Sequence, residues 1–128
     1  MLPEFVYKIA TFEQWDEALE GGTFNGAPVD LQDGYIHFST AGQVRETAAK
    51  HFAKPDGTGQ SGLMLVKVAT APMARHYKME VSRGGALFPH LYAKLPVVDA
   101  VVWEEIRLQA DGSHRFPDWF DDDESSAA

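Results

Sequence analysis

The chain has 128 residues, of which 45% are hydrophobic and 23% charged, and this length and composition predict one domain with its own core. It contains no cysteine, which excludes disulfides, thiolate nucleophiles and thiolate metal sites. The formal net charge of −8 argues against binding to a nucleic-acid backbone through bulk electrostatics.

The first quarter of the chain predicts a strand followed by a helix. Residues 5–9 have strand composition, and a helix is expected over about residues 12–20. Thr11 and Gln14 have the spacing of a capping box at its start. The glycines, proline and asparagine of residues 21–33 predict irregular structure.

The middle of the chain predicts a second strand and a second helix. Residues 35–39 have strand composition, and Thr40 is expected to start the helix with Gln43 at the capping-box position. Residues 55–62 are rich in glycine and polar residues and predict an exposed loop. A strong strand is expected over residues 63–68.

The last part of the chain predicts mainly strands. They are expected over residues 77–81, near residues 89–92, and over a long central segment around residues 100–106. Two main helices against a small mixed or antiparallel sheet give an α+β domain over residues 1–120. Residues 121–128 are acidic and small, and we expect a disordered, dispensable tail.

The first candidate for a functional site is a histidine and a serine at the end of a predicted strand. His37 and Ser39 are two residues apart, so they point to the same face. They directly precede a predicted helix N-terminus, which favours an anion such as phosphate. The alternative is that His37 is a hydrogen-bonded core residue and Ser39 only leads into the helix.

The second candidate is an extended segment that carries His90 and Tyr92 on one face, with Pro89 stiffening the approach. These two side chains can hold a flat ring or a sugar by stacking and hydrogen bonding. The alternative is an ordinary half-buried strand, with Phe88 and Leu91 on the core side.

Other kinds of site have little support. No HxH or HExxH spacing indicates a metal, no GxSxG motif indicates a hydrolase, and neither a P-loop nor GxGxxG is present. The carboxylates nearest predicted strand ends are Glu80, Glu104 and Glu105, each of which also fits a solvated surface charge. The sequence contains no run of 18 apolar residues, which a membrane-spanning helix would need. The first five residues lack the features of a signal peptide, so we expect a cytoplasmic protein.

Four segments together resemble a known family. They are residues 34–40 with Gln43, the pair Met79-Glu80, residues 88–92, and residues 98–102. The chain from about Val6 to Ile106 is similar to a small bacterial family classed as domain of unknown function 952. That family resembles a distant branch of the ADP-ribosyltransferase-like fold.

The resemblance implies a pocket for NAD or a similar nucleotide, with NAD as a substrate and no metal. His37 would hydrogen-bond the nicotinamide ribose near Ser39, and Tyr92 would stack on the nicotinamide. A glutamate would complete the site, and Glu80, Glu104 and Glu105 remain open for that role. His90 has no firm counterpart in the transferase pattern.

The expected catalytic residues are therefore His37, His90, Tyr92 and Glu80. The expected ligand-binding residues are Ser39, Thr40, Gln43 and Phe88. Two functions stay open: an NAD-dependent ADP-ribosyltransferase-like enzyme, and a non-catalytic small-ligand binding domain with the same pocket. The sequence predicts a nucleotide-like small-molecule partner, and neither a nucleic acid nor a membrane is expected as a partner.

Overall fold

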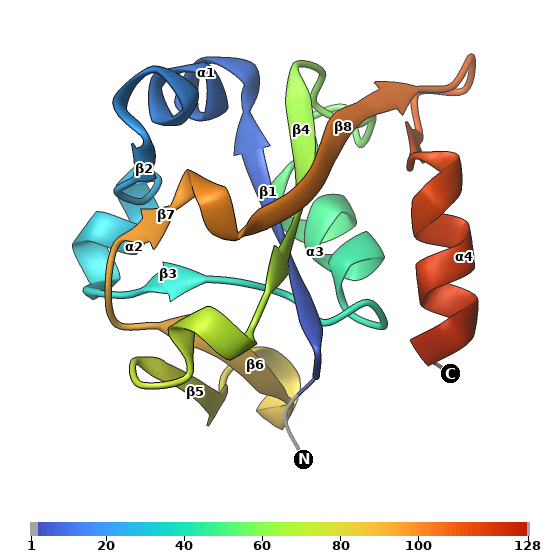
Figure 1. Cartoon of the computed structure of the whole chain (residues 1–128). Coiled ribbons are helices and arrows are strands. Elements are labelled where there is room, and N and C mark those ends of the chain that lie inside the picture. The colour runs from blue at the N-terminus through green and yellow to red at the C-terminus, as the bar shows by residue number, and fades with distance from the viewer. Residues whose placement is uncertain (1–2, 128) are drawn as a thin grey trace.

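Three antiparallel sheets organise the computed structural model, which describes residues 3–127 (Figure 1). The strands are β1 (Phe5–Thr11), β2 (Thr23–Phe24), β3 (Ile36–His37), β4 (Leu63–Ala69), β5 (Tyr77–Val81), β6 (Leu87–Leu91), β7 (Leu95–Pro96), β8 (Ala100–Leu108) and β9 (His114–Arg115). The helices are α1 (Phe12–Gly21), α2 (Pro28–Asp33), α3 (Val44–His51) and α4 (Asp118–Ala127). The strand orders are β1-β4-β8-β9, β2-β7 and β3-β6-β5.

The core lies on both faces of the β1-β4-β8-β9 sheet, because alternate residues of a strand point to opposite faces. Val6 and Ala10 of β1 pack in a buried cluster with Trp15 of α1. Tyr7 and Ile9 face the other way, into a buried cluster with side chains of α3 and α4. This two-sided burial explains why β1 and β4 are apolar along most of their length.

Several sequence predictions are confirmed. The Thr11 hydroxyl accepts from the Gln14 amide while the Gln14 side chain accepts from the Thr11 amide, so the capping box starts α1. The two strong strands predicted near residues 63–68 and 100–106 are β4 and β8. The fold class is α+β as predicted, and of the two predicted arrangements, mixed or antiparallel, every strand pairing among the described residues is antiparallel.

Two local predictions are wrong. Residues 21–33 contain β2 and α2 rather than irregular structure. Ala27, which precedes α2, has no side chain that could cap the helix, but its backbone amide donates to the Asp30 carboxylate at 2.7 Å. Helix α3 begins at Val44 rather than at Thr40. Residues 40–43 form a turn instead, in which the Gln43 amide donates to the Thr40 carbonyl.

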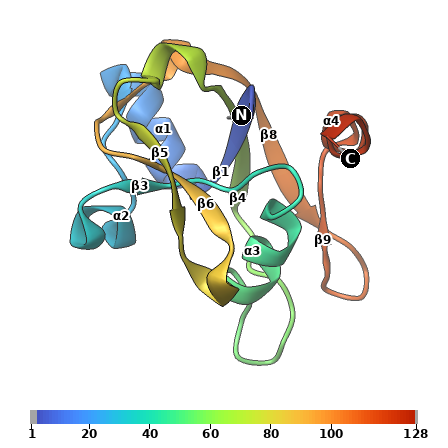
Figure 2. The ribbon, with the colours of Figure 1, turned by 90° about the horizontal axis from the view of Figure 1, so that it is seen from below.

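The acidic tail also differs from its prediction, since most of it is the helical segment α4. This helix lies at the edge of the molecule beside β9 and α3 (Figures 1 and 2). Phe120 is fully buried, and its ring meets Tyr7 edge-on at 5.2 Å. Arg45 of α3 pairs with Asp121 and Glu124 of α4. The negative charges from which disorder was predicted are therefore partly neutralised by this arginine. Residues 3–127 thus contain four α-helices where two main ones were predicted.

No helix among residues 3–127 is both long enough and apolar enough to cross a membrane.

Asp123 of α4 makes two polar contacts with the main sheet, and its substitution tests whether the helix stabilises the fold. Its carboxylate accepts from the Tyr7 hydroxyl at 3.0 Å and pairs with Lys67 at 2.8 Å. We expect Asp123→Asn to lower the free energy of unfolding by about 1–2 kcal/mol in urea denaturation. The control is Asp122→Asn, since Asp122 is exposed and has no polar partner in the described part of the chain. Equal midpoints for the two variants would contradict a stabilising role.

Candidate functional site

The β3-β6-β5 sheet brings the two candidate histidines together. His37 of β3 lies directly opposite His90 of β6, and their ring centroids are 5.5 Å apart. The pairing continues beyond β3, where the Phe38 amide donates to the Pro89 carbonyl at 2.9 Å. The register therefore converts two motifs that are far apart in the sequence into one site.

Tyr35 fills the space around these rings, although the sequence analysis did not single it out. Its ring stacks on His90 with centroids 4.1 Å apart, and lies 4.6 Å from His37 and 5.1 Å from Tyr92. Tyr35 precedes His37 by two residues, so the alternation that paired His37 with Ser39 could also have identified it.

Two carboxylates of α2 hold the His37 ring. The Nδ1 atom lies 2.7 Å from Asp30 and the Nε2 atom lies 2.9 Å from Asp33. Asp30 also accepts from the His37 backbone amide at 3.1 Å. These contacts fix the ring plane of His37. Neither aspartate was predicted as a site residue, because the composition of residues 21–33 indicates irregular structure.

Asp30 is buried together with a lysine. Lys8 of β1 lies 2.9 Å from Asp30 and also donates to the His37 carbonyl at 3.0 Å. Burial lowers the pKa of Lys8, and the charge of Asp30 opposes that effect. Burial raises the pKa of Asp30, but the hydrogen bonds from His37 and the charge of Lys8 outweigh it and bring the pKa to about 2.

Glu80 of β5 connects His90 with Tyr92. Its Oε1 atom lies 2.9 Å from His90 Nδ1 and accepts from the Tyr92 hydroxyl at 2.6 Å. The hydrogen bonds from Tyr92 and His90 lower the pKa of Glu80, and the same bond to Glu80 raises the pKa of Tyr92 to about 12. Glu80 is therefore an ionised carboxylate next to His90.

A cavity of about 650 Å³ opens beside the two histidines. Of the predicted site residues, His37, Ser39, Phe88 and His90 line it. The cavity also involves residues that the sequence analysis did not name: Thr47, His51 and Arg83. A pocket of this size is in the range that small-molecule ligands occupy.

The other predicted residues lie next to the cavity rather than in its wall. Glu80 contacts His90, Tyr92 contacts Glu80, and neither Glu80 nor Tyr92 lines the cavity. The Thr40 amide donates to the Gln43 side chain, which itself donates to the Leu87 carbonyl at 2.7 Å. Thr40 and Gln43 thus attach the β5–β6 hairpin to the turn before α3.

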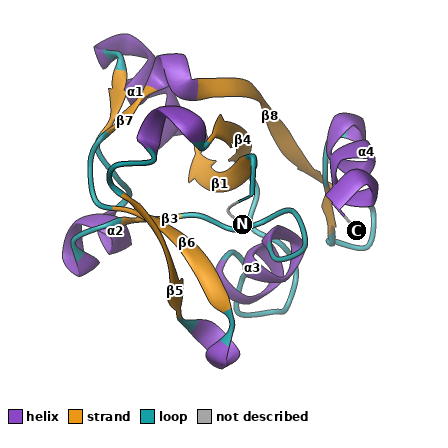
Figure 3. Ribbon diagram, turned by 60° about the horizontal axis from the view of Figure 1, so that its bottom comes forward, coloured by secondary structure: helices purple, strands orange, loops and turns teal. Residues whose placement is uncertain are grey.

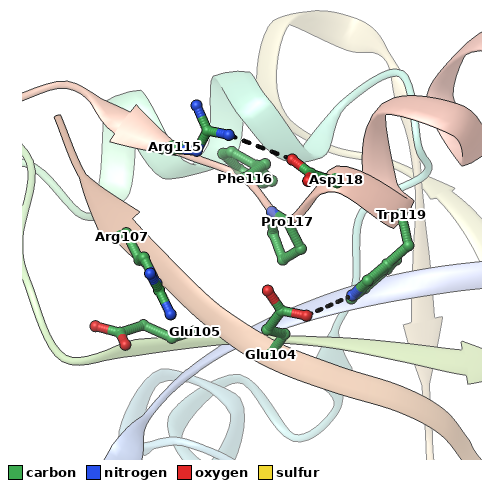
Figure 4. Close-up of a pocket in the computed structure, with 8 residues that line it drawn as sticks. All are labelled: Glu104, Glu105, Arg107, Arg115, Phe116, Pro117, Asp118 and Trp119. Carbon is green, nitrogen blue, oxygen red and sulfur yellow. Dashed lines mark hydrogen bonds and ion pairs between the residues drawn. The ribbon is translucent and has the colours of Figure 1, made fainter.

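Glu104 and Glu105 lie elsewhere, which narrows the choice among the three candidate glutamates. Figure 4 shows both on β8, at a second cavity of about 240 Å³ that α4 and the segment before it complete. Glu104 accepts from the Trp119 indole at 3.2 Å. None of the candidate histidines or tyrosines lines that cavity, so Glu80 is the glutamate that lies with them.

The fold and the site define this protein as a small α+β domain. Its antiparallel strands bring two histidines to the wall of one cavity. The chain belongs to the family described as protein of unknown function (DUF952), whose model matches residues 9–104. The family's description states no activity.

Solved structures of a relative have the same fold. The crystal structure of protein CC0527 from Caulobacter crescentus is 42% identical, with a TM-score of 0.81 over 91% of this chain and 98% of that one. The solution structure of CC0527 is 44% identical, with a TM-score of 0.73 over 86% of this chain and 90% of that one. No curated protein matches the chain.

Within residues 3–127, no group of three or more histidine, aspartate or glutamate side chains is arranged to hold a metal ion.

Asp30 and Asp33 contact the same imidazole but differ in burial, which gives a matched pair of variants. The Asp30 side chain is 1% exposed and the Asp33 side chain 39%. We expect Asp30→Asn to lower the free energy of unfolding by about 3–5 kcal/mol, because the buried charge of Lys8 loses its partner. Asp33→Asn should cost less than about 1 kcal/mol. Urea denaturation measures both, and similar losses would show that Asp30 does not carry the buried network.

The lowered pKa of Asp30 also predicts how stability depends on pH. A carboxyl whose pKa is lower in the folded state stabilises the protein above its unfolded pKa, and that stability is lost as the pH falls through the folded pKa. For Asp30 this loss runs from about pH 3.8 towards about pH 2. We expect the Asp30→Asn variant, compared with the original chain by denaturation at several pH values, to show a smaller loss over this range.

Proposed function

We propose that the cavity beside His37 and His90 binds a nucleotide-type small molecule such as NAD, as the likeness to ADP-ribosyltransferases implies. The observation that carries the proposal is the meeting of His37, His90 and Ser39 in the wall of one cavity of about 650 Å³. That volume is in the range of small-molecule sites.

The chemistry of the cavity wall suits a ring and a sugar. Phe88 and His90 supply faces for a flat ring, and the Ser39 hydroxyl supplies a hydrogen-bonding atom for a ribose hydroxyl. His37 Nε2 supplies a second one where a ribose hydroxyl takes the place of the exposed Asp33 carboxylate. The Asp30 and Asp33 carboxylates orient His37, so the free protein holds that ring in one position. A site ordered before the ligand arrives loses less entropy on binding.

In the enzyme form of this proposal, Glu80 supplies the catalytic charge. The bond between the ribose carbon and the nicotinamide nitrogen breaks, nicotinamide leaves with the bonding electrons, and an acceptor forms the new bond to carbon. Positive charge develops on the ribose in this step, and an ionised carboxylate stabilises it. Glu80 is the carboxylate that contacts both His90 and Tyr92.

One observation favours the alternative, a binding domain without catalysis. Glu80 and Tyr92 do not line the cavity, and the Oε1 atom of Glu80 already accepts from both His90 and Tyr92. A ligand could then occupy the cavity without meeting the carboxylate. Binding and chemistry therefore need separate tests.

The test of binding is a thermal melt of the chain with NAD, nicotinamide, ADP-ribose or a nucleotide. A ligand at 100 times its dissociation constant adds about 2.7 kcal/mol of stability, which is a clear rise in melting temperature. No shift with any of these compounds would contradict the proposal.

We expect His37→Ala to abolish that shift and to cost about 1 kcal/mol of stability or less. The side chain is 29% exposed, and without it Asp30 keeps its contacts with Lys8 and the Ala27 amide. A denaturant midpoint and a binding isotherm on the same variant provide the measurement. A loss of several kcal/mol together with normal binding would show that His37 is a core residue.

Glu80→Gln separates the enzyme from the binding domain. The amide keeps an oxygen that accepts hydrogen bonds from Tyr92 and His90 but removes the negative charge. If the chain is an enzyme, we expect unchanged NAD affinity and at least a 100-fold fall in nicotinamide release. Absence of nicotinamide release from the original chain, with NAD still bound, would support the binding domain.

A further inference from the structure

Arg83 gives the cavity a charged end that the proposed function does not use. It lies at the tip of the β5–β6 hairpin, in the 3-10 turn Arg83–Gly85, and lines the same cavity as His37 and His90. The hairpin extends beside α3 (Figures 2 and 3). Arg83 therefore faces the cavity from a different element than the two histidines.

The position of the Arg83 side chain is fixed from several sides. Its guanidinium lies over the Phe88 ring at 4.8 Å, and its Nη2 atom donates to the Thr47 hydroxyl at 3.2 Å. Gly84 and Gly85 have φ values of 66° and 80°, which lets the backbone turn tightly there. A guanidinium held in this way loses little entropy when it binds an anion.

The positive charge of Arg83 is less neutralised than that of Lys8, which lines the same cavity. Lys8 pairs with Asp30 at 2.9 Å. Arg83 approaches Glu46 only at 4.0 Å, and Glu46 pairs with Lys50 at 2.9 Å. Most of the five N–H donors of Arg83 thus have no acceptor at hydrogen-bond distance among residues 3–127.

Two hydroxyl groups lie next to Arg83 at this end of the cavity. The Ser39 hydroxyl lies 2.8 Å from the Thr47 hydroxyl, which is also the acceptor for Arg83. His51 lines the same cavity. Burial lowers the pKa of His51, and the nearby charge of Arg83 lowers it further.

We propose that Arg83, held by the Thr47 hydroxyl, forms a subsite that binds a phosphoryl group of the ligand. An arginine fork binds two phosphate oxygens at once. The Thr47 hydroxyl positions this fork as an acceptor, because its own proton goes to the Gln43 carbonyl at 3.2 Å. This inference rests on the proposed function for the identity of the ligand, and it names the group by which that ligand is held. It makes a phosphorylated ligand, rather than a free nucleoside, the preferred occupant.

Calorimetric titration with three probes tests the subsite: inorganic pyrophosphate, ADP-ribose and adenosine. We expect Arg83→Gln to weaken pyrophosphate and ADP-ribose binding at least 10-fold and to leave adenosine binding unchanged. Arg83→Lys keeps the charge without the fork and should give an intermediate loss. The control Arg75→Gln removes the same charge from an exposed residue outside the cavity and should bind all three probes normally. Urea midpoints confirm that each variant is folded.

The outcomes separate this inference from the proposed function. Equal ADP-ribose affinity in the original chain and in Arg83→Gln overturns the subsite and leaves the proposed function standing. Pyrophosphate binding that depends on Arg83, without binding of ADP-ribose or adenosine, supports the subsite and contradicts the proposed function. Failure of pyrophosphate and ADP-ribose to bind the original chain overturns the subsite.

Discussion

The Asp30 carboxylate joins three separate parts of the chain at the base of the cavity. It accepts from the Ala27 amide at the start of α2, pairs with Lys8 of β1, and holds both the ring and the backbone of His37. A buried charge without a partner is strongly unfavourable, so Asp30 and Lys8 stabilise one another only as a pair. The position of the candidate catalytic histidine therefore depends on an ion pair that reaches into the main sheet.

The second constraint is the register between β3 and β6. Because His37 lies opposite His90, a shift of one residue would send one of the two rings to the other face of the sheet. The Phe38 amide and the Gln43 side chain bind β6 beyond the short strand β3, which strengthens this register. The same hairpin carries Glu80 and Arg83, so one register places the carboxylate, the imidazole and the guanidinium.

Charge is distributed unevenly over the fold. Acidic residues of α4 meet Arg45 and Lys67, while Arg83 on the hairpin side of the cavity approaches Glu46 only at 4.0 Å. A chain of net charge −8 thus keeps a region beside the cavity in which a cation is incompletely paired. Such a region attracts a phosphorylated compound without a basic surface of the size that nucleic acids need.

Much of the site could be predicted from local patterns in the sequence. The alternation of side chains placed His37 with Ser39 and His90 with Tyr92, and the Thr11 capping box marked the start of α1. These signals are local, because they depend only on residues two or three positions apart. They were enough to identify an α+β domain and the two motifs that meet at the cavity.

Only the tertiary structure decided which distant groups meet. Asp30 lies in a segment rich in turn-forming residues, and its role depends on Lys8, which is 22 residues away. Glu80 could be preferred to Glu104 only once β5 was seen beside β6. The acidic tail gave a composition typical of disorder, and it forms α4 because Arg45, Lys67 and Tyr7 supply partners from the body. Long-range pairing of charges leaves no local pattern, so the sequence alone could not show it.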